Sequence, residues 1–140
     1  MFSNIEINSL KTITVNGGNV KHFLNSNDES YKGFGEVYFS FVDFEIIKGW
    51  KLHTKMTMNL VVPIGNVGFV FYDQVNKEFM NYTIGEKNYK RLTVPPNTWF
   101  GFKGLSSNHN LVVNFADIKH DQNEAKKLEI TRFSYNWGAL

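Results

Sequence analysis

The residues with the clearest chemical potential lie in one short stretch, KGWKLHTKMTMN, at residues 48–59. Its histidine, His53, is one of four in the chain, and the other three lie in polar segments typical of solvated surface histidines. In an extended strand alternate side chains share a face, so His53, Lys51 and Lys55 should point the same way. This face predicts a cavity or contact with water, because unpaired buried polar groups are costly.

A second polar residue in an apolar context is Asp117, in the run NLVVNFADI at residues 110–118. An acid inside an apolar strand needs a partner, and a pair with His53 would satisfy both groups. A carboxylate on one ring nitrogen fixes the tautomer and raises the basicity of the other nitrogen. The pair would make His53 a general base, although the spacing is equally compatible with two unrelated strand residues.

The sequence predicts no metal site. The chain has no cysteine, and no second histidine or carboxylate lies at ligand spacing near any of its four histidines. Tryptophans such as Trp50 are candidates for stacking on a sugar or a nucleobase, but aromatic residues in β proteins are mostly core. The alternative for Trp50 is therefore a packing role.

Seven apolar runs of strand length predict an all-β sandwich or barrel, because Gly, Pro and Asn separate them at about 8–12 residue spacing. These runs are residues 36–46, 58–65, 66–73, 78–84, 90–96, 98–104 and 110–118. Residues 11–35 read as turns or a loop. Residues 121–130, DQNEAKKLEI, predict a short C-terminal helical turn capped by Asp121 with Glu124.

Length and charge limit the class of protein. The 140 residues fit a single domain spanning 1–140, and 42% hydrophobic residues suffice for a packed core. A net charge of +2, with both signs interspersed, disfavours nucleic acid as a partner. The first residues lack the features of a leader, and no apolar run approaches the roughly 18 residues of a membrane span. We expect a cytoplasmic protein that does not bind membranes.

Three segments resemble a known family in the order and separation of their motifs. VVPIGNVGFVFYD, IGEKNYKRLTVPPNTWFGFKGLSS and NLVVNFADIKHDQNE are similar to the motifs of the cupin-fold dTDP-4-dehydrorhamnose 3,5-epimerases, over about residues 36–124. The resemblance implies a cupin jelly-roll β-barrel that forms a homodimer. It also implies a nucleotide-sugar substrate, surface polysaccharide biosynthesis and a metal-independent reaction without a cofactor.

Carried over by position, the resemblance places His53 on the family's catalytic base and Asp117 on its paired aspartate. It places Val113 on the tyrosine that serves as general acid and Phe100 on a corner histidine, so both of those side chains are absent here. Another group or water would then have to return the proton. Tyr38 and Tyr72 are candidates for this proton donor. For each of them the alternative is a packing role.

The implied reaction is removal of a proton beside the ketone of an NDP-4-keto-6-deoxy sugar and its return to the opposite face at C3, C5 or both. Lys51 or Lys55 would stabilise the enolate oxygen. Further predicted substrate-binding residues are Asn59, Trp50 and Arg91, with a solvated strand end as the alternative for Arg91.

Two other functions stay open at this point. One is a cupin that binds a sugar or nucleotide sugar without catalysis, which would suit Val113 and Phe100. The other is a keto-sugar isomerase, although related isomerases usually carry a paired H-x-H where Lys55 takes the second place here. A metal-dependent cupin is disfavoured by the missing ligands.

Overall fold

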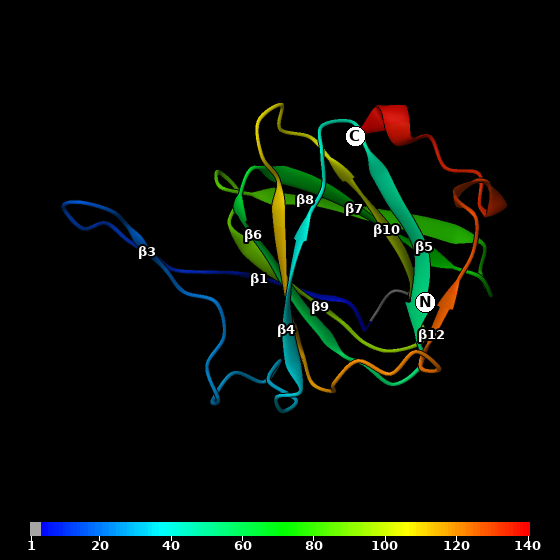
Figure 1. Cartoon of the computed structure of the whole chain (residues 1–140), viewed down its shortest axis with the longest axis horizontal. Helices are drawn as coiled ribbons and strands as arrows, with labels where there is room; N and C mark the ends of the chain where they lie inside the picture. Colours follow the sequence, from blue (N-terminus) through cyan, green and yellow to red (C-terminus); the bar gives the residue numbers. More distant parts are fainter. Residues whose placement is uncertain (1–3) are drawn as a thin grey trace.

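The computed structural model describes residues 4–140, so residues 1–3 of the predicted 1–140 domain lie outside the described part. Two antiparallel five-stranded sheets face each other (Figure 1). The first sheet contains, from edge to edge, β1 (Glu6–Ser9), β9 (Lys90–Val94), β6 (Met58–Ile64), β11 (Leu111–Ala116) and β4 (Glu36–Phe41). The second sheet contains β12 (Ala125–Lys127), β5 (Ile47–His53), β10 (Trp99–Gly104), β7 (Asn66–Asp73) and β8 (Glu78–Gly85). This arrangement confirms the predicted all-β jelly-roll barrel.

The alternation of β4 shows how the sequence sets the two faces of a strand. Tyr38 and Ser40 are half-buried and line the space between the sheets, whereas Val37, Phe39 and Phe41 are exposed on the outer face of the first sheet. Side chains of successive strand residues point to opposite faces, so a period of two separates the two groups.

The main core lies between the two sheets. Its fully buried members include Val62, Val67, Phe69, Ile84 and Leu92, all contributed by strands that the apolar runs predicted. Burying such side chains is worth about 1.5–3 kcal/mol each, so the apolar runs supply the main driving force for closing the sandwich.

A second cluster, the outer aromatic cluster, covers the opposite face of the second sheet. It consists of Trp50, Leu52, Val70, Trp99 and Phe133, with further C-terminal side chains packed around them. Two short 3₁₀ helices, η1 (Ile130–Arg132) and η2 (Trp137–Ala139), hold this C-terminal segment near the sheet. The structure therefore gives Trp50 and Trp99 a packing role, which was the alternative to stacking on a ligand.

The predicted helical turn at residues 121–130 is wrong, because 125–127 extend as β12 and pair with the free edge of β5. β6 and β7 follow each other in the chain but belong to different sheets. The chain crosses between the sheets at Gly65, whose φ of +84° favours glycine and whose Cβ would lie 2.1 Å from the His109 carbonyl oxygen.

The N-terminal region contains three short strands, and two of them, β2 (Thr12–Ile13) and β3 (Val20–Lys21), lie within residues 11–35, which the sequence predicted as turns or a loop. β1 pairs with β9 at the edge of the first sheet. Among the described strands, β2 and β3 pair with each other and with no other strand. This β2–β3 arm projects away from the barrel (Figure 1). The arm is exposed along most of its length.

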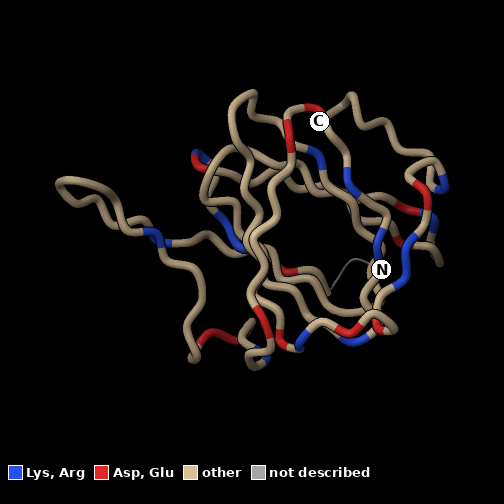
Figure 2. Tube along the Cα trace, in the orientation of Figure 1, with Lys and Arg blue, Asp and Glu red and all other residues tan. Residues whose placement is uncertain are grey.

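Charges of both signs are spread along the trace without a one-sided basic stripe (Figure 2), which agrees with the interspersed charges of the sequence. None of the helices within residues 4–140 is long and apolar enough to span a membrane.

Candidate active site

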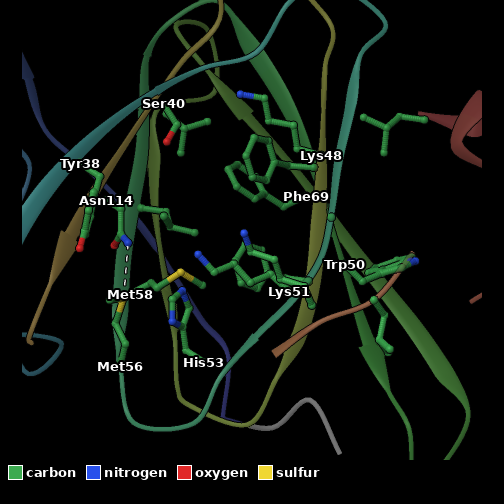
Figure 3. A pocket seen from close by; sticks show the side chains of 18 of the residues that line it. Tyr38, Ser40, Lys48, Trp50, Lys51, His53, Met56, Met58, Phe69 and Asn114 are labelled. Atoms are coloured by element: carbon green, nitrogen blue, oxygen red, sulfur yellow. Dashed lines mark hydrogen bonds between the residues drawn. The ribbon is translucent and has the colours of Figure 1, made fainter. Parts of the chain in front are cut away.

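A cavity of about 920 Å³ lies between the two sheets (Figure 3). This volume is within the range of sites for small molecules. Its apolar lining includes Met56, Met58, Leu60, Phe69 and Phe100. Its polar lining includes Tyr38, Ser40, Lys48, Lys51, His53, Asn114, His120 and Lys127. The cavity thus combines apolar walls with a few polar groups, as binding sites for organic ligands do.

His53 lies at the end of β5 and is 7% exposed. Its Nδ1 atom lies 2.6 Å from Oε1 of Glu124, which is 4% exposed. The pairing of β12 with β5 produces this contact, because Ala125 is the register partner of His53 and Glu124 directly precedes it. The other carboxylate oxygen of Glu124 accepts hydrogen bonds from the backbone N–H groups of Lys55 at 2.9 Å and Met56 at 3.1 Å.

These contacts set the charge state of the pair. Burial raises the pKa of Glu124, but hydrogen bonds from the Lys55 backbone, His53 and the Met56 backbone outweigh it, so this pKa is lowered. Burial lowers the pKa of His53 from its ordinary 6.5, against the opposing effect of Glu124. At neutral pH the arrangement is an ionised Glu124 that accepts a hydrogen bond from Nδ1–H of a neutral His53.

The second ring nitrogen of His53, Nε2, has no hydrogen-bond partner among the described residues. His53 lines the cavity and stacks on Phe100, with ring centroids 6.0 Å apart and planes 18° from parallel. Glu124 fixes the tautomer on one side of the ring and Phe100 limits its tilt. His53 therefore presents a free lone pair at Nε2, which is the requirement for a general base.

The predicted pair between His53 and Asp117 is wrong. Oδ1 of Asp117 accepts a hydrogen bond from the backbone N–H of Thr57 at 2.8 Å, and Asp117 does not line the cavity. Asp117 follows Val113 and Phe115 in alternation, and that face of β11 is the outer one. The predicted match of Val113 to the family's tyrosine fails for the same reason, because Val112 and Asn114 are the β11 residues that line the cavity.

Lys51 is the second predicted residue that the structure places in the cavity, on the same face of β5 as His53 (Figure 3). Its register partner on β12 is Lys127, which lines the cavity as well. Burial first and Lys127 second lower the pKa of Lys51, while Glu124 opposes them. Two cations thus meet near the His53–Glu124 pair.

The predictions that Lys55 shares the face of His53 and that Asn59 lies at the substrate site are wrong. β5 ends at His53, and the chain turns before β6 begins at Met58, so the alternation does not continue. Lys55 is exposed outside the cavity. Asn59 is buried on the outer side of the first sheet, where its Nδ2 donates to the Ser30 carbonyl at 2.9 Å and its Oδ1 accepts from the Thr93 hydroxyl at 2.6 Å.

Arg91 and Trp50 also lie away from the predicted position. Arg91 is buried on the outer side of the first sheet and donates to the Phe23 carbonyl at 2.7 Å and to Asp28 at 3.2 Å. Trp50 borders the cavity, but its indole lies in the outer aromatic cluster and donates to the Ile130 carbonyl at 3.0 Å. In Figure 3 this indole points away from the cavity. Both side chains therefore have structural partners instead of a free face toward a ligand.

Sequence reasoning missed Glu124 and Asn114. Glu124 was assigned to a helix cap, and only the pairing of β12 with β5 reveals its role. Asn114 faces the cavity from β11, and its buried Oδ1 has no hydrogen-bond partner within residues 4–140. The sequence signal that could have identified Asn114 is its position as a polar residue between Val113 and Phe115 in an apolar strand.

Within residues 4–140, no group of three or more His, Asp or Glu side chains is arranged to hold a metal ion.

Comparisons with known proteins show what this chain is similar to. No model of a known protein family matches the sequence. A curated relative is the probable low-salt glycan biosynthesis epimerase Agl13 of Haloferax volcanii, which is 23% identical over 124 residues, covering 84% of this chain and 80% of the relative. The crystal structure of dTDP-6-deoxy-D-glucose-3,5-epimerase from Legionella pneumophila superposes with a TM-score of 0.79 at 13% identity, covering 91% of this chain and 73% of that one.

A nearer solved structure is the dTDP sugar isomerase from Desulfovibrio desulfuricans G20. It is 31% identical, covers 99% of this chain and 93% of its own, and superposes with a TM-score of 0.92. Identity of this level over nearly the whole length of both chains reflects common descent as well as a common fold. The chain therefore belongs to the cupin-fold family of dTDP-sugar isomerases and epimerases.

Proposed function

We propose that this protein is an epimerase that acts at C3, C5 or both of an NDP-4-keto-6-deoxy sugar in polysaccharide biosynthesis. The observation that carries the proposal is the His53–Glu124 pair, buried at the wall of a cavity large enough for a nucleotide sugar. Hydrogens on carbons beside a ketone are acidic, so a positioned neutral imidazole is sufficient to remove one. A curated relative named as a glycan biosynthesis epimerase supports this reading.

In the proposed reaction Nε2 of His53 takes the proton from the carbon beside the ketone, and the electron pair moves to the ketone oxygen. The resulting imidazolium is stabilised by Glu124, whose ionised carboxylate already bonds Nδ1–H. Lys51, on the same face of β5, supplies a positive charge for the enolate oxygen. Return of a proton to the opposite face of that carbon inverts the centre.

The nucleotide part of the substrate carries a diphosphate, which requires cations. We assign this role to Lys127, which lines the cavity beside Lys51 and is itself exposed. A lysine at the boundary between cavity and solvent can bind phosphate oxygens while the sugar lies deeper. The Legionella pneumophila neighbour was crystallised with dTDP-4-keto-L-rhamnose, which is a ligand of this chemical class.

A keto-sugar isomerase is the second candidate. Two observations favour it. The solved structure at 31% identity is described as a dTDP sugar isomerase, and the cavity face of β5 carries Lys51 two residues before His53. A second titratable group beside the base could move a proton between neighbouring oxygens while His53 moves one between carbons. The ketone would then shift position instead of a centre inverting.

One experiment separates these functions. Candidate dTDP-4-keto-6-deoxy sugars are incubated with the enzyme in D₂O, and proton NMR follows each carbon of the ring. An epimerase incorporates deuterium at C3 or C5 and yields the inverted sugar, which is the expected result. A shifted ketone would replace the proposal by the isomerase, and binding of the sugar without any deuterium uptake would contradict catalysis.

We further propose that the protein is a cytoplasmic homodimer. The β2–β3 arm projects from the barrel with Ile13, Val15 and Val20 exposed, and an isolated two-stranded hairpin is at best marginally stable in water. The outer face of β4 exposes Phe39 at 67% and Phe41 at 62%. A second copy would cover such apolar surface.

Light scattering after gel filtration tests the assembly. The wild type should elute with the mass of two chains, and Phe39→Glu should shift it toward one chain because a charge would be buried in the interface. A wild type with the mass of a single chain at micromolar concentration would contradict the dimer.

A further inference from the structure

We propose that Tyr38 is the group that returns the proton to the sugar, so that the acid of this enzyme stands on β4 and not on β11. This inference rests on the proposed function, because it assigns the second half of the same reaction. The β11 residues that line the cavity are Val112 and Asn114, and neither carries a proton that a carbanion could take.

The position of Tyr38 is suited to the task. Tyr38 lines the cavity from β4 in the first sheet, whereas His53 lines it from β5 in the second sheet. In Figure 3 Tyr38 and Asn114 lie on the side of the cavity opposite Lys51. A sugar ring between the sheets would present one face to His53 and the other to Tyr38, and inversion requires removal and return of the proton on opposite faces.

Tyr38 is held by neighbours that keep its proton in place. Its hydroxyl donates to Oε2 of Glu36 at 2.6 Å, and the same oxygen accepts the backbone N–H of His120 at 2.9 Å. Burial first and Glu36 second raise the pKa of Tyr38 to about 12. The phenol is therefore protonated throughout the neutral range, and Glu36 acts as a positioning residue.

Asn114 adds a second polar group beside Tyr38. It is the register partner of Tyr38 on the adjacent strand, and its buried Oδ1 has no hydrogen-bond partner within the described chain. A buried acceptor without a partner costs free energy until a donor arrives. A hydroxyl group of the sugar is such a donor, so Asn114 would fix the ring next to the Tyr38 hydroxyl.

The reaction conserves protons, because each proton removed from the sugar is replaced by one from Tyr38. After His53 has taken the first proton, the enolate carries the negative charge. The Tyr38 hydroxyl first gives up its hydrogen bond to Glu36 and turns toward the sugar carbon. Its O–H bond then breaks, the proton forms the new C–H bond on the opposite face, and the ketone is restored. The phenolate and the imidazolium then exchange one net proton through water, which can reach the cavity beside the exposed residues His120 and Lys127.

The test measures proton exchange and inversion separately in Tyr38→Phe. His53 in this variant can still remove the proton and return deuterium from D₂O to the same face. We expect deuterium uptake with retained configuration within about tenfold of the wild-type exchange rate, while inversion falls by about 10²- to 10⁴-fold, the usual contribution of a positioned acid. Binding of dTDP should be unchanged.

A matched variant completes the design. Tyr72→Phe removes the hydroxyl of a tyrosine that packs against the outer aromatic cluster and does not line the cavity. It should leave both rates unchanged.

Wild-type rates of inversion in Tyr38→Phe would overturn the assignment. An equal loss of exchange and inversion would also overturn it, because Tyr38 would then act on the enolate and not on the returning proton. Absence of exchange in the wild type would instead contradict the proposed function itself.

Discussion

Two buried polar clusters, one on the outer side of the first sheet and one at the cavity between the sheets, differ in where their unpaired polar atoms lie. On the outer side of the first sheet, Asn59 bonds Ser30 and Thr93, and Arg91 bonds Phe23, Asp28 and Ser30. Arg91 Nε there has no partner among the described residues, but Arg91 does not line the cavity. In the cavity, Glu124 uses both oxygens, but Nε2 of His53 and Oδ1 of Asn114 have no partner among the described residues. The first cluster holds a loop on a sheet, and the second presents groups to a ligand.

The comparison shows that burial of polar side chains is not by itself a sign of function. Both clusters satisfy most of their hydrogen bonds internally, as buried polar groups must. The cavity cluster is distinguished by a lone pair and an acceptor that face an open volume of about 920 Å³. Substitutions in the two clusters should therefore have different consequences, on catalysis in one and on stability in the other.

The largest effect is expected for His53→Asn. The side-chain amide can still donate to Glu124 in place of Nδ1, so the fold should persist, but the base is gone. We expect deuterium exchange to fall by about 10²- to 10⁴-fold with dTDP affinity nearly unchanged. Calorimetric titration with dTDP alongside the NMR assay checks this, and wild-type exchange would remove His53 from the mechanism.

Glu124→Gln should have the next largest effect. An amide cannot accept from His53 and from both backbone N–H groups with the same strength, and it does not stabilise an imidazolium. We expect kcat to fall by about 10- to 100-fold, by analogy with the loss of a carboxylate that orients a metal-ligating histidine. Asp117→Asn is the matched control and should stay within about threefold of the wild type, since the Asp117 carboxylate accepts from the Thr57 backbone N–H and does not line the cavity. Equal losses in the two variants would restore Asp117 as the partner.

Asn59→Leu should affect stability and spare catalysis. The substitution leaves the Ser30 carbonyl and the Thr93 hydroxyl without their partner in a buried site. We expect the free energy of unfolding to fall by about 1–3 kcal/mol, with kcat per folded enzyme within about twofold of the wild type. Urea denaturation gives the first quantity, and a large drop in kcat at unchanged stability would place Asn59 in the site after all.

The smallest effect is the pH dependence. Protonation of Nε2 removes the base, so kcat/KM should fall on the acid side. Since burial lowers the pKa of His53 below 6.5, this fall should occur below pH 6.5. In the same window the unfolded chain binds a proton that the folded enzyme does not, so stability also decreases as the pH falls. A midpoint above 6.5 in the pH profile would contradict a buried neutral His53.

The strands were predictable because their apolar content and alternation are local properties. The runs at 66–73 and 78–84 match β7 and β8 within one residue. Alternation gives two faces but does not say which one is internal. For this reason Lys51 and His53 were placed correctly in a cavity, while Asn59, Arg91 and Asp117 were placed in it although they face outward or lie beyond it.

The partner of His53 was not predictable from local pattern. Glu124 lies 71 residues along the chain from His53, and only the register of β12 against β5 brings them together. A short edge strand such as residues 125–127 has too few residues for a periodic signal, so a helix cap was an equally good local reading of DQNE. Long-range pairing decided between the two.

The most direct test of the central claim is the protonation state of the His53 ring. Nitrogen-15 NMR of the uniformly labelled enzyme, with His53→Asn used to assign the signal, reports both ring nitrogens. The account predicts a neutral ring at pH 7, with the proton on Nδ1, a bare Nε2, and proton uptake only below pH 6.5. A ring that is doubly protonated at pH 7, or that carries its proton on Nε2, would contradict it.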